Sequence, residues 1–263
     1  MKATWIICSL LALPAGAASA ADSPWNGTWK LDLEKSHLTG QTFTYSARPG
    51  GMLHYDDGST ASFDFGLDGK EYKTWANRTT TWTAAGKNAW DTITRSDGSV
   101  RSKGHIALSE DGKTLTMSFA GKRPDGQDFH EEDVFNRVDG SDGLVGTWRT
   151  AKVTGGPTGL PQTFVISSPA AGALHYEIPD MKASAEGSTD GADHPLTGPT
   201  VPPGATISFK RLAPTKIKYT IKINGQPDSI GVQTIAPDGR SFTDTNWNPG
   251  RENEKTTAFY VKQ

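Results

Sequence analysis

The chain has 263 residues and a nearly balanced charge, with 27 Lys and Arg against 29 Asp and Glu and a formal net charge of −2 at pH 7. Because it has no basic runs, this balance argues against nucleic acids and anionic membrane surfaces as partners. Cys8 is the single cysteine. Once the segment around it is removed, the composition excludes disulfides, iron–sulfur clusters and cysteine-bound zinc.

Residues 1–20 have the pattern of a secretory signal peptide. Lys2 supplies the positive end, Trp5 to Leu13 the apolar run, and Ala18-Ser19-Ala20 a small-x-small cleavage site. The apolar run is too short for a membrane span. We therefore expect cleavage after Ala20, no membrane insertion, and a periplasmic or secreted protein.

After this segment, short stretches rich in Thr, Val, Ile and aromatic residues alternate with turn dipeptides such as Asp57-Gly58 and Asn224-Gly225. This spacing is typical of antiparallel hairpins. The only segment with the apolar spacing of a helix is one turn at 32–37. Residues 183–204, rich in Gly, Pro, Ser and Asp, are expected to form a long loop. The predicted strands of the N-terminal half are 27–32, 42–47, 52–56, 61–67, 79–84, 89–96, 99–109, 114–121 and 129–138.

Gly27-Thr28-Trp29 recurs as Gly146-Thr147-Trp148, and the sequence after each copy runs in parallel. Such a repeat indicates duplication of one unit. We expect two domains, 21–139 and 140–263, joined by a short polar link at 138–143. An antiparallel meander with one apolar face is expected to close on itself. The predicted fold class is all-β, with two tandem up-and-down barrels.

The Gly-x-Trp opening, with a basic residue at the end of the last strand, resembles the lipocalin signature. The chain is most similar to exported lipocalin-like proteins of Gram-negative and acidobacterial species, which open with Gly-Thr-Trp-Lys-Leu and a Lys-Ser, as in Gly27–Leu31 and Lys35-Ser36. The resemblance implies two lipocalin-like barrels with floors sealed by cation–π pairs, Trp29 with Arg137 and Trp148 with Lys262. It implies no particular activity.

Strand alternation selects the side chains that can line a lumen. In the pairs at 54–55 and 175–176, adjacent His and Tyr residues point to opposite faces, so one member of each pair faces inward. An inward His suits general-base or ligand roles, and an inward Tyr suits a wall. The candidate ligand-binding residues are Tyr45, Tyr55, Phe63, Trp82, Trp90, His175, Tyr176 and Tyr219.

A pair of carboxylates is the candidate for chemistry. Counting back in steps of two from Phe135 places Asp133 and Glu131 on the inward face. Two carboxylates in a lumen raise each other's pKa, which suits acid–base work, and His54 would complete the set. A bulge near Phe129 would instead turn both carboxylates toward water.

Three functions remain open on the sequence. The leading hypothesis is an exported protein that binds a small, mainly hydrophobic or aromatic molecule in one or both lumens. The second is a cofactor-free lyase, isomerase or hydrolase that uses His54, Glu131 and Asp133. The third is a structural or interaction module with plugged barrels. The sequence has no metal-ligand spacing and no phosphate or dinucleotide motif, so no metal or cofactor is expected, and a partner protein stays undefined.

Overall fold

The computed structural model describes residues 23–75, 77–157 and 159–263, and this part of the chain is mostly β-strand. The expected signal peptide lies outside the described residues. Two 3-10 turns, η2 (Pro49–Gly51) and η3 (Pro179–Met181), interrupt the strands. The strands are β1 (Gly27–His37), β2 (Thr42–Arg48), β3 (Met52–Asp56), β4 (Ser62–Phe65), β5 (Glu71–Lys73), β6 (Arg78–Gly86), β7 (Ala89–Ser96), β8 (Ser99–Leu108), β9 (Thr114–Lys122), β10 (Asp128–Asp142), β11 (Val145–Gly155), β12 (Thr163–Ser167), β13 (Ala173–Ile178), β14 (Ala183–Ser188), β15 (Asp190–Thr197), β16 (Ala205–Ala213), β17 (Lys216–Ile223), β18 (Gln226–Ile235), β19 (Ser241–Trp247) and β20 (Thr256–Lys262).

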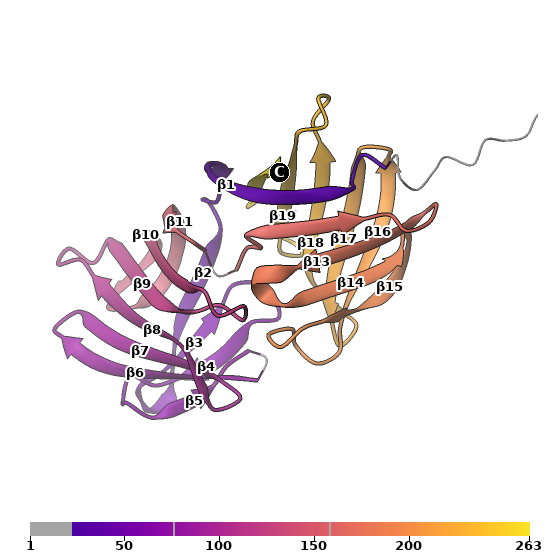
Figure 1. The fold of residues 1–263 in the computed structure, drawn as a ribbon. Coiled ribbons are helices and arrows are strands. Elements are labelled where there is room, and N and C mark those ends of the chain that lie inside the picture. Colours follow the sequence, from indigo (N-terminus) through magenta and orange to yellow (C-terminus); the bar gives the residue numbers. More distant parts are fainter. Residues whose placement is uncertain (1–22, 76, 158) are drawn as a thin grey trace, which may run out of the picture.

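These strands form two ten-stranded antiparallel barrels (Figure 1). In the first barrel the order is β4-β3-β2-β11-β10-β9-β8-β7-β6-β5, and the end strands β4 and β5 contact each other. The second barrel is closed and runs β1-β12-β13-β14-β15-β16-β17-β18-β19-β20, with β20 paired to β1. The predicted all-β class with two antiparallel barrels is confirmed.

The first strand of each repeat lies in the barrel of the other repeat. β1 pairs with β12 and β20, and β11 pairs with β2 and β10. In Figure 1 the indigo β1 runs along the orange and yellow barrel. The first barrel is therefore the continuous segment 42–155, and the second is 163–262 completed by 27–37.

Because of this exchange, the expected boundary between residues 139 and 140 does not coincide with the boundary between the two barrels. A division between residues 139 and 140 does not separate the two sheets, because β10 and β11 on either side of it are hairpin neighbours. The polar segment 138–143, expected as a link between barrels, belongs to that hairpin, with Asp142 opposite Val145. Turn-forming residues look the same in sequence whether they join two strands of one sheet or two domains.

The chain passes between the barrels in two short segments, 38–41 after β1 and 156–162 after β11. The first of these is tied to β11, since Gly40 N–H donates to Thr150 O and Thr150 N–H donates to Gln41 O, both at 2.9 Å. Because β1 and β11 are equivalent strands, each can take the other's place in a barrel at low cost in free energy. A short connecting segment disfavours the return of such a strand onto the sheet that follows it in the chain. The duplication and the short hinges together account for the exchange.

Each barrel packs its own apolar interior. Strands alternate inward and outward residues, so one face of every strand contributes to a core. Residues that form the core of the first barrel include Phe43, Tyr45, Leu53, Phe65, Trp82, Ile106, Leu108, Leu115, Met117, Phe135, Leu144 and Trp148. Residues that form the core of the second include Trp25, Trp29, Phe164, Ile166, Leu174, Tyr176, Phe209, Ile217, Tyr219, Ile235, Phe242 and Tyr260.

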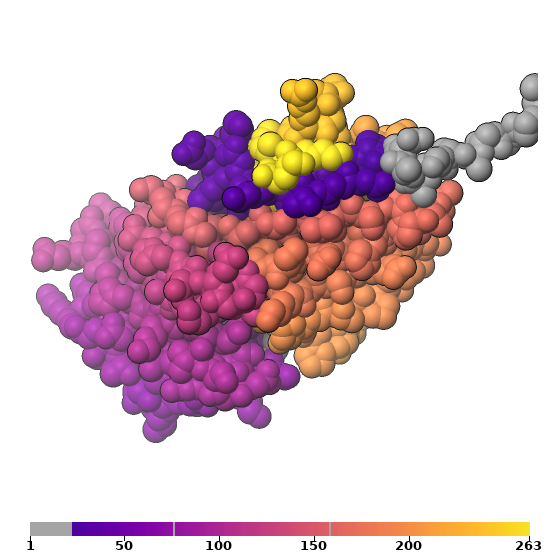
Figure 2. Space-filling view, viewed as in Figure 1, coloured from indigo at the N-terminus to yellow at the C-terminus, as the bar shows by residue number. Residues whose placement is uncertain are grey.

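Polar contacts hold the two barrels against each other, and in Figure 2 they form one continuous body with β1 lying over the second barrel. The Glu254 carboxylate accepts a hydrogen bond from Thr42 N–H at 3.0 Å, and Arg251 Nη1 donates to Thr42 O at 2.9 Å. Arg123 and Asp180 form an ion pair at 3.9 Å in which both side chains are 8% exposed. Buried charges are retained in proteins when they are paired, so these contacts fix the relative position of the barrels.

Two local expectations were wrong. Residues 183–204, expected as a loop, contain β14 and β15, which pair with each other and with strands on either side. Side chains of β15 are mostly exposed, so no apolar alternation marks it as a strand. The turn expected at 32–37 is part of β1, where the register becomes irregular between Asp32 and His37. The short strand β5 was not predicted.

Candidate functional site

The floor of each barrel is closed by a cation–π pair, but the partners differ from those expected. Arg137 lies over Trp148 at 4.1 Å from the ring centre, and Lys262 lies over Trp29 at 5.0 Å. The expected pairs, Trp29 with Arg137 and Trp148 with Lys262, were wrong because β1 and β11 are exchanged between the barrels.

The glycine of each Gly-Thr-Trp lets the basic side chain approach. Gly27 and Gly146 have φ angles of 142° and 141°, which disfavour any other residue. A Cβ on Gly27 would lie 2.6 Å from Lys262 Cε, and one on Gly146 would lie 2.2 Å from Asp139 O and 2.8 Å from Arg137 Nη1. The repeated motif is therefore structural, and chemistry is not expected at the floors.

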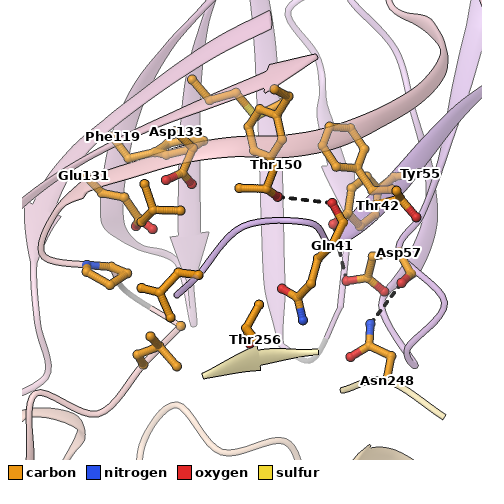
Figure 3. Close-up of a pocket in the computed structure, with 18 of the residues that line it drawn as sticks. Gln41, Thr42, Tyr55, Asp57, Phe119, Glu131, Asp133, Thr150, Asn248 and Thr256 are labelled. Carbon is orange, nitrogen blue, oxygen red and sulfur yellow. Dashed lines mark hydrogen bonds between the residues drawn. The ribbon is translucent and has the colours of Figure 1, made fainter. Parts of the chain in front are cut away.

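A cavity of about 550 Å³ opens at the mouth of the first barrel, where this barrel faces the second (Figure 3). Its volume falls within the roughly 300–1,000 Å³ typical of small-molecule sites. The wall comes from β2, β3, β4, β6, β9, β10 and β11. Residues that line it are Leu38, Gln41, Thr42, Phe43, Tyr45, Tyr55, Asp57, Phe63, Trp82, Met117, Phe119, Glu131, Asp133, Phe135, Thr150, Val153, Pro157, Gly159, Leu160, Asn246, Asn248 and Thr256.

Four of the aromatic residues chosen from the sequence lie together in this wall: Tyr45, Tyr55, Phe63 and Trp82. Tyr55 stacks on Phe63 with ring centres 5.1 Å apart, and Trp82 meets Tyr45 edge to face at 6.3 Å. Burial raises the pKa of Tyr45 and of Tyr55, so both phenols stay neutral. The aromatic faces give the cavity a mainly apolar wall that suits a flat ligand.

Glu131 and Asp133 also line the cavity, because alternate residues on β10 share one face. Of the two placements that the sequence left open, the structure has the inward one, and the shift in register falls later than Phe129, between Val134 and Phe135. Glu131 is 7% exposed. Asp133 Oδ1 is buried and accepts no hydrogen bond from the described residues. In Figure 3 both side chains point into the cavity across from Tyr55.

The environment of Asp133 favours its neutral form. Desolvation raises the pKa of this carboxyl to about 7, with further contributions from the charges of Glu131 and Glu132. A carboxyl group with a pKa near neutrality can hold or release a proton under ordinary conditions. Glu132 lies between the other two carboxylates on β10, and its carboxylate lies 3.5 Å from Ser118 Oγ.

The mouth of the cavity is covered by parts of the chain that sequence reasoning did not connect with it. Leu38 and Gln41 come from the first crossing segment, Leu160 from the second, and Asn246 and Thr256 from the second barrel. Thr150 Oγ1 donates to Gln41 O at 3.2 Å, as Figure 3 shows. No sequence signal marks these residues, since they meet only because the strands are exchanged.

In the second barrel, the candidate ligand-binding residues Tyr176 and Tyr219 belong to a buried polar network. Tyr176 donates to Gln233 Oε1 at 2.7 Å, Gln233 Nε2 donates to Asp244 Oδ2 at 3.0 Å, and Tyr219 donates to Asp244 Oδ1 at 3.0 Å. Burial raises the pKa of Asp244 to about 6, while the hydrogen bonds from Gln233 and Tyr219 oppose that rise. Tyr176 and Tyr219 therefore support each other inside the barrel and do not line the cavity of the first barrel.

Three other candidates lie elsewhere. Both histidines alternate with core residues, so they face away from the lumens. His54 Nδ1 lies 2.6 Å from Asp64 Oδ1 and its Nε2 lies 3.2 Å from Ser62 Oγ, on the outer face of β3 and β4. His175 lies on the outer face of β13, and Trp90 packs against the first core without lining the cavity. The expectations that His54 serves the lumen and that His175 lines it were wrong, because the inward positions belong to Tyr55 and Tyr176. Trp90 faces inward but lies in the packed part of the core, away from the cavity.

Among residues 23–75, 77–157 and 159–263, no group of three or more His, Cys, Asp or Glu side chains could hold a metal ion. No helix within the described residues is long and apolar enough to cross a membrane. No protein-family model matches the chain, and no curated protein matches it.

Proposed function

We propose that this protein is an exported binding protein that holds a small, mainly apolar or aromatic molecule in the cavity of the first barrel. The observation that carries the proposal is the cavity of about 550 Å³, with its aromatic wall and its few polar groups. Concave, mainly apolar sites with a small number of placed polar groups are typical of ligand binding. The resemblance to lipocalin-like proteins agrees with this proposal but names no ligand.

Titration with N-phenyl-1-naphthylamine, a neutral aromatic dye that fluoresces in apolar surroundings, tests the proposal. We expect saturable binding to the wild-type chain. Val153 lines the cavity opposite Asp133 on β11, so Val153→Phe fills part of it and weakens binding by about tenfold or more. Val100→Phe is the matched control, because Val100 is 50% exposed on the same barrel. Equal affinity in both variants would count against the cavity as the site.

Native mass spectrometry of the chain purified from its own host gives a second test. Binding proteins of this kind are expected to carry a small molecule through gentle purification, and the mass of the polypeptide is expected to show cleavage after Ala20. The cavity weighs against the alternative of a structural module with two plugged barrels.

A cofactor-free acid–base enzyme is the second candidate, favoured by the raised pKa of Asp133 beside Glu131. His54 has no part in it, since this residue lies outside the cavity. A carboxylate in an apolar cavity accelerates proton abstraction from 5-nitro-1,2-benzisoxazole: the carboxylate takes the C3 proton, the N–O bond breaks, and a coloured cyanophenolate forms. We expect the rate to rise with pH through about 7 and to be lost in Asp133→Asn. Without a rate that depends on Asp133, this candidate fails.

A further inference from the structure

The charges around the cavity all have one sign. Asp57, Glu131 and Asp133 line it, and the described residues of its wall include no lysine, arginine or histidine. Arg251, which donates to O of the lining residue Thr42, is paired with Glu254 at 3.4 Å. Arg123, which donates to Gly156 O, is paired with Asp180 at 3.9 Å. The electrostatic field inside is therefore negative, and it favours a cation over a neutral or anionic ligand.

The carboxylates that line the cavity differ in whether they can accept a hydrogen bond from a ligand. Asp57 is occupied, because its Oδ1 accepts hydrogen bonds from Ser59 N–H and Oγ and its Oδ2 accepts one from Tyr55. Asp133 Oδ1 accepts none from the described residues although it is buried. A buried acceptor without a donor costs free energy, and a ligand that brings the donor regains it.

The kinds of side chain that line the cavity favour an organic cation over a metal ion. Hard metal ions need several oxygen ligands close together, and no group of three or more metal-binding side chains occurs among the described residues. Aromatic rings from Tyr45, Tyr55 and Trp82 surround the remaining volume. Aromatic faces attract cations and cover flat apolar groups.

We propose that the ligand is an arylalkylamine, an aromatic ring that carries an aliphatic amine, with its ring against Tyr55, Phe63 and Trp82 and its ammonium group between Glu131 and Asp133. Residues two apart on a strand are separated by about 6.6 Å, so one ammonium group with three donors reaches both carboxylates. This inference rests on the proposed binding function and narrows it to one chemical class.

The proton balance of ligand binding depends on the titratable groups around Asp133. These are Glu131 in the lumen and Glu132 on the same strand, both of which raise its pKa by their charge, together with the neutral phenols of Tyr45 and Tyr55 and the engaged carboxylate of Asp57. An ammonium ion stabilises the charged form of Asp133. Binding therefore releases a proton near pH 7, and the affinity for the amine falls as the pH is lowered below 7.

Isothermal titration calorimetry with three ligands that share one ring tests the inference: 2-(1-naphthyl)ethylamine, 2-(1-naphthyl)ethanol and 3-(1-naphthyl)propanoate. At pH 8 we expect the amine to bind at least about tenfold more tightly than the alcohol, as charge-assisted hydrogen bonds imply, and the acid to bind most weakly. Asp133→Asn with Glu131→Gln should bring the ratio of amine to alcohol affinity close to one. Glu132→Gln is the matched control on the same strand and should keep the preference.

Two further readouts keep the test decisive. In the wild-type chain, the amine should lose affinity between pH 8 and pH 5.5 while the alcohol does not, a result that depends on no variant. If the alcohol binds as tightly as the amine, the inference is overturned while the proposed binding function stands. If none of the three naphthyl ligands binds and N-phenyl-1-naphthylamine does not bind either, both are overturned.

Discussion

The guanidinium group of Arg137 lies 4.1 Å from the ring centre of Trp148, and this contact joins the end of one repeat to the start of the next. Arg137 Nη1 also donates to Val145 O at 2.7 Å, and Trp148 Nε1 donates to Leu144 O at 2.9 Å. The floor of the first barrel is thus built across the turn that sequence reasoning took for a domain boundary.

Replacing Gly146 by alanine is expected to destabilise the protein. Its φ of 141° is unfavourable for alanine, and the added Cβ would collide with Asp139 O and Arg137 Nη1. Strain of this kind costs about 1–3 kcal/mol, and urea denaturation measures the loss. Gly159→Ala is the control, since a Cβ there meets nothing within 4 Å. An unfolding free energy equal to that of the control would contradict the role assigned to Gly146.

A fragment of residues 42–155 is expected to fold alone, because it contains all ten strands of the first barrel. A fragment of residues 21–139 has similar length but lacks β11, so β2 and β10 lose their shared neighbour. The fragment still contains β1, the copy of β11, but the short segment 38–41 disfavours the return of β1 onto β2. Unpaired backbone groups and an open floor should therefore leave the fragment without a cooperative transition. Near-ultraviolet circular dichroism and thermal melting distinguish the two fragments. Cooperative unfolding of 21–139 alone would show that β1 can replace β11, and it would contradict the role assigned to the short segment 38–41.

The buried carboxyl of Asp244 should make stability depend on pH. Its pKa in the folded protein is about 6, above the value of 3.8 for an ordinary aspartate, so the folded state binds the proton more tightly than the unfolded state. The contribution is fully present below pH 3.8 and is lost as the pH rises through about 6, with a total of about 3 kcal/mol.

Urea denaturation of the wild type and of Asp244→Asn between pH 4 and pH 7 measures this contribution. The unfolding free energy of the wild type relative to the variant should fall across that range. Asp238→Asn, in an exposed turn, should leave the pH profile of the wild type unchanged. A constant difference between the wild type and Asp244→Asn would refute the assignment.

Asp180→Asn is expected to weaken both stability and ligand binding. Asp180 pairs with Arg123 and accepts hydrogen bonds from Gln162 N–H and Thr163 N–H at 3.1 and 3.2 Å. Breaking a buried ion pair costs about 3–5 kcal/mol, and the crossing segment that carries Leu160 to the cavity loses its support. Thermal melting and titration with N-phenyl-1-naphthylamine measure the two effects. Asp97→Asn, at an exposed position in the turn between β7 and β8, should change neither.

The candidate site was only partly predictable. Alternation from Phe135 placed Glu131 and Asp133 inside the barrel, and it also gave Tyr45 and Phe63 as wall residues. Alternation alone could not decide between the members of a His-Tyr pair, and it gave no reason to connect Leu160 or Asn246 with the first barrel. Those residues reach the cavity through contacts between segments far apart in the chain.

The sequence by itself determined the all-β class, the number of barrels and the faces of most strands, because hairpin turns and a two-residue period are local properties. Only the tertiary structure decided which barrel receives each Gly-Thr-Trp strand. The two strands begin with the same motif and offer nearly the same edge, so local preference does not distinguish a strand from its copy. The short segments 38–41 and 156–162 determine which barrel receives each strand. The pairing of Arg137 with Trp148 and the covering of the cavity by the second barrel follow from that arrangement.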